Sequence, residues 1–285
     1  MTNSKNLHIN EVKEYFKSYN SISIADFYNF YKNIDNTIKK NSVESLIYEL
    51  QQNNIIKFIA RDQYMLVDSD YGQIQDYIVI SMDIIKSTKI DYKKFNKDLN
   101  EKVKNLNNFI NKIYNTNREF HISQGDAIQI IIPFSDIFIY LLISAIAHLR
   151  PYKLRYAISV GSFDSELKKN SWDMNGPIFW NASDCIAKLK KSTNYDGLIL
   201  SEYSHSDLIC NNILSLINVN LSKITDKQWE AIKLDLSNEE SKSIEKKLNI
   251  TLTSYYERLS NSNISNIIEA LQSIVEIIKK RGSIL

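Results

Sequence analysis

Two aspartates stand where an apolar run gives way to a turn, and carboxylates in such positions can hold metal ions. Asp83 follows the apolar residues 77–82, and Asp126 lies in the turn 124–126 between two further apolar runs. Converging carboxylates with no basic neighbour in sequence are the oxygen ligands that hold Mg²⁺ or Mn²⁺ against substrate phosphates. We therefore expect Asp83 and Asp126 to meet at one sheet edge. Alternatively, Asp83 caps the following turn and Asp126 fills a turn position that favours Asp.

The turn after Asp83 is a candidate phosphate-binding segment. The residues of this turn can offer backbone N–H groups, hydroxyls or an ammonium group to a phosphate. They are Ile84, Ile85, Lys86, Ser87 and Thr88. Backbone N–H groups that precede a helix bind anions because they point at the ligand. A nucleotide is therefore the ligand that we expect here.

The elements that must position these residues lie in the middle block, residues 71–215. Residues 77–82 have the continuous apolar pattern of a buried central strand, and residues 95–113 have the apolar stripe of a long amphipathic helix. The pattern then predicts strands at 120–123 and 127–132, a buried helix at 135–148 and a strand at 154–160. A helix at 178–189 and a strand at 198–201 follow. The order βαββαβ predicts an α+β protein with a ferredoxin-like or palm-type α/β sandwich.

The first block, residues 1–70, predicts a winged-helix-like domain. Apolar residues recur at helical spacing from Val12 to Tyr19 and from Val43 to Leu50, and a further helix is expected around residues 25–31. A short hairpin over residues 55–67 follows. Winged helices bind DNA through their third helix. This block carries 8 Lys and Arg against 9 Asp and Glu, which is poor for neutralising phosphates. Both DNA binding and protein contacts therefore stay open.

The last block, residues 216–285, has the order of helices and turns that is typical of a helix-turn-helix. Trp229 marks one helix, residues 237–240 fit a capping box that opens a second, and a turn at 249–251 leads to a third. We expect the third helix to bind DNA through side chains opposite Tyr255 and Leu259, namely Thr253, Ser254, Tyr256 and Arg258.

A final helix carries an apolar stripe at heptad spacing, made of Ile264, Ile268, Leu271, Val275 and Ile278. Packing within its own domain and a dimer seam both explain this stripe. A homodimer, through the stripe or through the middle block, is the oligomer that we expect.

The order and spacing of the middle-block motifs resemble the SatD family, a distant relative of the class III nucleotidyl cyclases. The motifs are ISMDIIKST at 80–88, SQGDAIQ at 123–129, LRYAISVG at 154–161 and NGPIFWNA at 175–182. Members of that family often end in a helix-turn-helix similar to residues 229–259. The resemblance covers about residues 75–260, and it implies a cyclase-like palm fold with a metal-nucleotide cleft.

The resemblance to the cyclases carries only part of their site over to this chain. Their two metal-binding aspartates match Asp83 and Asp126. Ile122 stands where they place a purine-reading Lys, and Cys185 stands where an Arg stabilises the charge of the transition state. The resemblance therefore implies the fold and a possible Mg²⁺ or Mn²⁺ site, and it weakens the case for cyclisation.

The composition excludes several classes of protein. With 35 Lys and Arg against 33 Asp and Glu, the formal net charge is +2, so no global positive field attracts nucleic acid or an anionic membrane. Two cysteines and a polar N-terminus without a signal peptide predict a cytosolic protein.

Two hypotheses of function follow from the sequence, and a third is a scaffold that binds no ligand. The first is a DNA-binding or signalling regulator whose degenerate cyclase-like domain senses a nucleotide or mediates dimerisation. The second is a metal-dependent enzyme that acts on a nucleoside triphosphate at Asp83 and Asp126.

Overall fold

In the computed structural model the chain forms two compact units, Met1–Ile74 and Gln75–Leu285. The residues that the structure describes are 11–12, 14–15, 22–52, 55–60, 63–66, 76–87, 91–123, 125–192, 196–201, 204–237 and 241–280.

The first unit contains the second and third helices and the hairpin that its sequence predicts, and most of the first predicted helix lies outside the described residues. Its elements are β1 (Ile22–Ser23), α2 (Ile24–Ile34), α3 (Lys40–Gln52), β2 (Ile56–Ala60) and β3 (Gln63–Leu66). The strands pair antiparallel in the order β1-β3-β2. Ser23 and Asp26 form a capping box at the start of α2, and Phe27, Tyr31 and Leu50 lie in the core. Strand β1 was not predicted, and Phe16, Tyr19 and Val67 lie outside the described residues.

The second unit is built on a five-stranded sheet of order β5-β6-β4-β7-β8. The strands are β4 (Asp76–Ile84), β5 (His121–Ile122), β6 (Ile128–Pro133), β7 (Leu154–Ser162) and β8 (Gly197–Leu200). All neighbours pair antiparallel except β7 and β8, which are parallel. The helices before β8 are α4 (Tyr92–Tyr114), α5 (Ile137–His148), η2 (Ser171–Asp173) and α6 (Pro177–Lys191). The predicted βαββαβ order is therefore present in β4 to β7.

The C-terminal part is helical. It consists of α7 (Ser204–Leu221), α8 (Asp226–Leu236), α9 (Ser241–Leu248), α10 (Leu252–Ser262) and α11 (Ile264–Lys279). The sequence predicts the last four of these helices, whereas α7 was not predicted. Residues 238–240 of the expected capping box lie outside the described residues.

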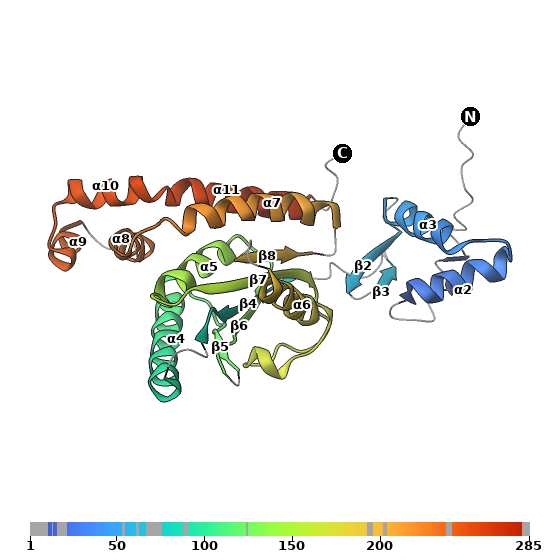
Figure 1. Cartoon of the computed structure of the whole chain (residues 1–285), viewed down its shortest axis with the longest axis horizontal. Coiled ribbons are helices and arrows are strands. Elements are labelled where there is room, and N and C mark those ends of the chain that lie inside the picture. Colours follow the sequence, from blue (N-terminus) through green and yellow to red (C-terminus); the bar gives the residue numbers. More distant parts are fainter. Residues whose placement is uncertain are drawn as a thin grey trace. The chain divides into compact units, whose positions relative to one another are not determined.

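Helices cover both faces of the sheet (Figure 1). Alternate residues of β4 point to opposite faces because side chains alternate along a strand. Ile78, Ile80 and Met82 pack in the larger core with α4 and α5, and Val79 packs with Phe179 of α6 on the other face.

Helices α8 and α11 contribute buried residues to the larger core, and α8, α9 and α10 also bury a small cluster of their own. Trp229, Leu271 and Val275 belong to the same buried cluster as the sheet residues, and α7 lies beside α11 (Figure 1). The expected boundary at 215/216 falls inside α7. The heptad stripe of α11 therefore packs within its own chain, which is one of the two explanations that the sequence left open.

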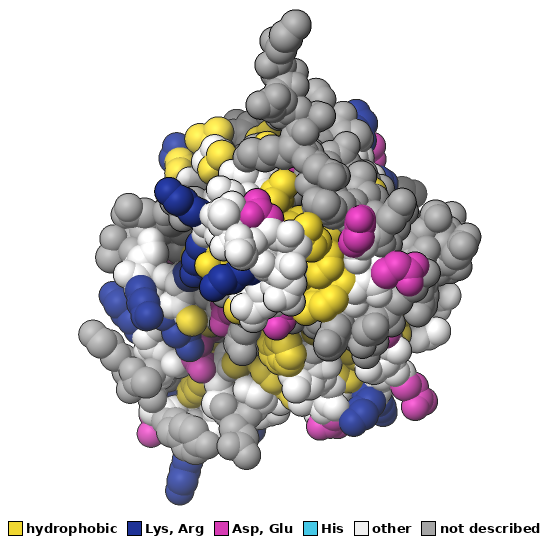
Figure 2. Space-filling view, turned by 90° about the vertical axis from the view of Figure 1, so that its right-hand side faces the viewer, with side chains coloured by type: hydrophobic (Ala, Val, Ile, Leu, Met, Phe, Trp, Pro, Cys, Tyr) yellow, Lys and Arg dark blue, Asp and Glu magenta, His cyan; other side chains and the backbone are white. Residues whose placement is uncertain are grey.

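Two further features of the described residues bear on the sequence-based expectations. Within the described part of the chain, none of the helices combines the length and the apolarity needed to cross a membrane. On the face turned to the viewer in Figure 2, basic and acidic side chains are interspersed, as the small net charge of +2 suggests.

Candidate functional site

The register of the sheet brings Asp83 and Asp126 to the same end of neighbouring strands. Met82 of β4 pairs with Ile128 of β6, so both aspartates lie just beyond that pair. The hairpin closes through a hydrogen bond from Ser123 N–H to the Ala127 carbonyl, with Gly125 at a φ of 110°. Both aspartates thus occupy the sheet edge where the sequence predicts them.

Asp83 is already neutralised by two cationic side chains of its own chain. Its Oδ2 accepts from Nη1 of Arg155, directly across on β7, at 3.2 Å, and its Oδ1 lies 2.7 Å from Nζ of Lys190 on α6. Only 5% of the Asp83 side chain is exposed, against 21% for Arg155 and 53% for Lys190. The carboxylate is buried as the centre of an ion-paired triplet, as buried charges require.

The residues around Asp83 do not fit a divalent cation in this arrangement. Both of its oxygens contact protein cations, and the described part of the chain contains no group of three or more His, Cys, Asp or Glu side chains that could hold a metal ion. Mg²⁺ and Mn²⁺ prefer oxygen ligands that carry uncompensated charge. No chemical step through a metal follows from this geometry.

The predicted phosphate-binding turn offers fewer free donors than its sequence suggests. Ile84 belongs to β4 and its side chain is buried, and the Ile85 N–H donates to the Lys153 carbonyl. Lys86 is exposed and has a left-handed backbone with a φ of 63°, a conformation that is uncommon outside glycine. Ser87 is partly buried, and Thr88 lies outside the described residues.

The first α-helix that the described residues contain after this turn is α4, which starts at Tyr92. The carboxylate of Asp91 caps its first turn by accepting from Lys94 N–H. Lys86 is therefore the residue of this turn whose charged group is most available to a ligand.

The helix after the Gly-Pro entry carries Cys185, the residue that the resemblance to the cyclases aligns with their Arg. Gly176 precedes α6 with a φ of 151° and Pro177 is the first helical residue. Cys185 is buried, and burial raises the pKa of its thiol to about 11. The thiol stays protonated and contributes neither charge nor nucleophile.

The aromatic residues that flank the Gly-Pro entry anchor local structure. The Trp172 indole N–H donates to the His121 carbonyl at 2.9 Å, and the Trp180 indole N–H donates to Asn175 Oδ1. These bonds tie the loop before α6 to the hairpin and to α6.

The predicted DNA-binding residues divide into two pairs on α10. Thr253 and Tyr256 are exposed, and Tyr256 presents 57% of its surface to solvent. Ser254 and Arg258 are partly buried, so the expectation that all four lie opposite Tyr255 was wrong for these two. Helical geometry explains the difference because residues 254 and 258 flank the buried stripe that includes Tyr255.

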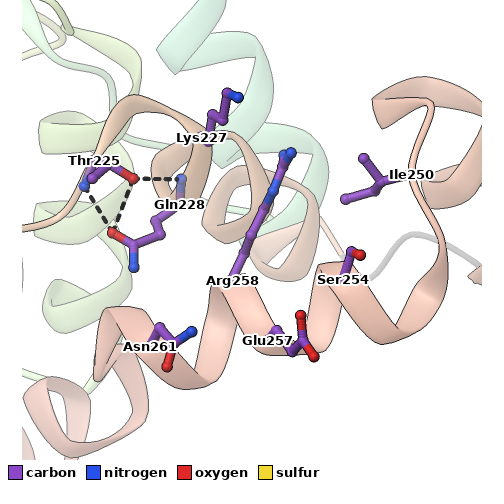
Figure 3. Close-up of a pocket in the computed structure, with 8 residues that line it drawn as sticks. All are labelled: Thr225, Lys227, Gln228, Ile250, Ser254, Glu257, Arg258 and Asn261. Carbon is purple, nitrogen blue, oxygen red and sulfur yellow. Dashed lines mark hydrogen bonds between the residues drawn. The ribbon is translucent and has the colours of Figure 1, made fainter.

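Ser254 and Arg258 instead line a pocket of about 400 Å³ between α8 and α10. Figure 3 shows Arg258 extending from α10 toward the first turn of α8, where Thr225 and Gln228 form a capping box. The complete lining is Thr225, Lys227, Gln228, Ile250, Ser254, Glu257, Arg258 and Asn261. Lys227 and Arg258 bring two cationic groups to this pocket, and Glu257 brings a carboxylate that sequence reasoning had not included.

Together, the sheet and its covering helices define a mixed α+β protein with an open five-stranded sheet and a helical C-terminal part that shares its core. The family model of the SatD family matches residues 77–278, so the chain belongs to the SatD family. The match includes the C-terminal helices as far as α11. No curated protein matches this chain.

The ion-paired state of Asp83 leads to a prediction about metal binding. In the wild type, millimolar Mn²⁺ should leave the midpoint of thermal unfolding unchanged because Lys190 already satisfies Asp83. In Lys190→Ala one oxygen of Asp83 becomes available, and Mn²⁺ should raise the midpoint by mass action, since it binds the native state only. Lys191→Ala, which removes an exposed lysine from the same turn of α6, is the control. A Mn²⁺ shift in the wild type as large as in Lys190→Ala would show that the triplet does not block metal.

Proposed function

We propose that this protein is a DNA-binding regulator in which α9 and α10 form a helix-turn-helix. Its sheet-bearing body is a degenerate, cyclase-like domain that binds a nucleotide or pairs two copies. The observation that carries the proposal is the junction of α9 and α10. The two helices are joined by the turn 249–251, in which Asn249 has a left-handed backbone with a φ of 51°. A short turn of this kind is typical of the helix-turn-helix.

The core of this motif supports the proposal. Ala231 of α8, Ile244 of α9 and Tyr255 of α10 are buried together, and the Tyr255 hydroxyl donates to Asp235 of α8 at 3.1 Å. The three helices therefore hold α10 in a fixed orientation with its outer face exposed. A second helix held in this way is the element that helix-turn-helix proteins place in the major groove.

The sheet supports the cyclase-like part of the proposal. The order β7-β4-β6-β5, with its βαββαβ connections, resembles the palm of the class III cyclases. The ion pairs of Asp83 with Arg155 and Lys190 favour a regulator over an enzyme because they occupy the carboxylate that the cyclases use for metal.

The surface charge of the motif favours weak binding by a single copy. Tyr256 and Thr253 can reach base edges, and exposed Lys246 on α9 can contact a phosphate. Glu257 is exposed beside them and repels phosphates. A motif with so few phosphate contacts needs two copies on one site for useful affinity.

A mobility-shift titration on the DNA upstream of the protein's own gene tests this proposal. We expect Tyr256→Ala to weaken specific binding about 5- to 100-fold, the range of one base contact. Lys246→Ala should weaken binding to specific and random DNA alike and reduce the slope of log affinity against log salt by about 1.

The control for lost charge is Lys104→Ala, which removes an exposed lysine from α4. Wild-type binding that neither α9 nor α10 variant changes would contradict the assignment. The winged-helix-like first unit, whose third helix α3 begins at Lys40, would then be the candidate for DNA contact.

A further inference from the structure

Helix α7 has one buried face and one apolar face that the second unit leaves exposed. The buried face includes Asp207, Cys210, Leu214 and Ile217. On the other face four large apolar side chains are exposed, namely Leu208 (66%), Ile209 (45%), Leu216 (68%) and Val219 (51%). Three other large apolar side chains of the described residues are comparably exposed, and they lie on three different helices. The exposed apolar surface is therefore concentrated on α7, as at interaction sites.

The exposed face of α7 has the spacing of a helix-pairing seam. Ile209, Asn212, Leu216 and Val219 follow one another at intervals of three, four and three residues, and all four are exposed. This is the heptad pattern that packs one helix lengthwise against another. A single polar residue within such a seam fixes the register of the pair, because an unmatched Asn would face apolar side chains.

The charge of this face selects a second copy of the chain as the occupant. Among residues 204–221, Asp207 is the only Asp, Glu, Lys or Arg, and it lies on the buried face. The exposed face therefore presents no Asp, Glu, Lys or Arg of α7 to a nucleic acid or to a strongly charged protein. Two copies of one face bring identical groups together around a two-fold axis, so a self-pairing face must avoid like charges. This face meets that condition.

The size of the face sets the expected strength of pairing. Eighteen residues make a helix about 27 Å long at 1.5 Å per residue. A stable dimer buries about 800 Å² on each partner, and one helix of this length supplies only the centre of such an interface. The dimer should therefore dissociate on dilution, with a dissociation constant in the micromolar range.

We propose that the exposed face of α7, centred on Ile209, Asn212, Leu216 and Val219, is a self-association surface that pairs two copies of the chain. This inference deepens the proposed function, since it names the surface that pairs the regulator. It also replaces the α11 stripe, which is buried within the chain.

Sedimentation velocity of the full chain over a range of concentrations tests the pairing. We expect a reversible dimer for the wild type. Leu216→Glu places a charge in the seam and should weaken the dimer at least about 100-fold. An interfacial charge without a partner lowers affinity by this amount. The midpoint of thermal unfolding should stay unchanged because Leu216 is mostly exposed.

A charge-swap mixture makes the test specific for α7 pairing with α7. Leu216→Glu and Leu216→Lys should each be monomeric alone and should form a heterodimer when mixed, since opposite charges then meet. Ile34→Glu introduces the same charge at an exposed apolar residue of α2, and it should leave the dimer intact.

Two outcomes overturn the proposal. One is a wild type that stays monomeric at concentrations well above the micromolar range. The other is a dimer that Leu216→Glu leaves intact. DNA titrations of Leu216→Glu separate this failure from that of the proposed function. If monomeric Leu216→Glu still binds DNA weakly, and adding Tyr256→Ala reduces that binding further, the helix-turn-helix assignment stands.

Discussion

Replacing Trp229 by Ala is expected to lower the free energy of unfolding of the second unit by about 3–5 kcal/mol, the range for a fully buried Trp. Trp229 lies on α8 and is 1% exposed. It belongs to the core that contains the sheet residues, whereas Ala231 of the same helix faces α9 and α10. Loss of the indole therefore opens a cavity where α8 packs against α5. Urea unfolding followed by circular dichroism measures the effect.

The number of unfolding transitions in Trp229→Ala tests whether the C-terminal helices belong to the sheet unit. Because α7, α8 and α11 are buried in the core of the sheet and α9 and α10 pack on α8, we expect the sheet and these helices to unfold together in both wild type and variant. Trp180→Ala removes a partly buried Trp from α6 and should have a smaller effect. A separate transition that contains only the C-terminal helices, and that alone responds to the substitution, would show an independent domain after residue 215.

The second large effect concerns the buried carboxylate of Asp207. Its Oδ1 accepts from the Ser201 N–H at 2.8 Å, and its Oδ2 has no hydrogen-bond partner among the described residues. Burial raises the pKa of this carboxyl from 3.8 to about 7. Hydrogen bonds from Ser201 and the positive charge of Lys188 lower the pKa by a smaller amount. Asp207→Asn should therefore stabilise the protein at pH 8 because it keeps the acceptor and removes the buried charge.

The pH dependence follows from the sign of this pKa change. Below pH 4 the carboxyl is protonated in both the folded and the unfolded chain, so it contributes no pH dependence. Between pH 4 and 7 the unfolded chain loses the proton while the folded chain keeps it. The free energy of unfolding then falls by about 1.4 kcal/mol per pH unit, or about 4 kcal/mol in total. Above pH 7 the penalty is constant.

Urea unfolding at pH 4, 6 and 8 measures this contribution. The difference between Asp207→Asn and the wild type should be near zero at pH 4 and largest at pH 8, up to about 4 kcal/mol. Asp164→Asn, at an exposed carboxylate, should change stability by less than about 0.5 kcal/mol at every pH. Equal pH profiles for wild type and Asp207→Asn would refute a raised pKa.

Periodicity predicted the elements that have one apolar stripe and missed the helix that has two. The long helix α4 and the final helix α11 each bury one side of a regular pattern, so their positions follow from the sequence. In α7 apolar residues occur on opposite sides, since both Leu214 and Leu216 belong to stripes. No single face stands out in such a pattern, and the predicted domain boundary consequently fell inside this helix.

The candidate site was predictable in position but not in its electrostatics. Asp83 was located because a strand ends beside it. Its ion pairs depend on the register of β4 against β7 and on the packing of α6, which brings Lys190 to Asp83 from 107 positions further along the chain. The continuous apolar run before Asp83 gave no indication of which face of the sheet it occupies, because a strand buried on both faces has no alternation.

The β8 edge of the five-stranded sheet is closed by side chains, and this closure affects the tendency of the folded protein to aggregate at high concentration. An open strand edge presents unpaired N–H and C=O groups on which a foreign strand can add, as in amyloid. At β8 the side-chain amide of Asn211 pairs with both the N–H and the carbonyl of Ile199 at 2.8 Å, and Asp207 accepts from Ser201 N–H. Two side chains of α7 thus occupy the place of a sixth strand.

The opposite edge, β5, is only two residues long, and short edges are poor templates for strand addition. Aggregation by growth of the sheet is thereby disfavoured at both ends in the folded state. Loss of Asn211 would expose the β8 edge without touching the core, and fibril formation would then compete with folding at high protein concentration.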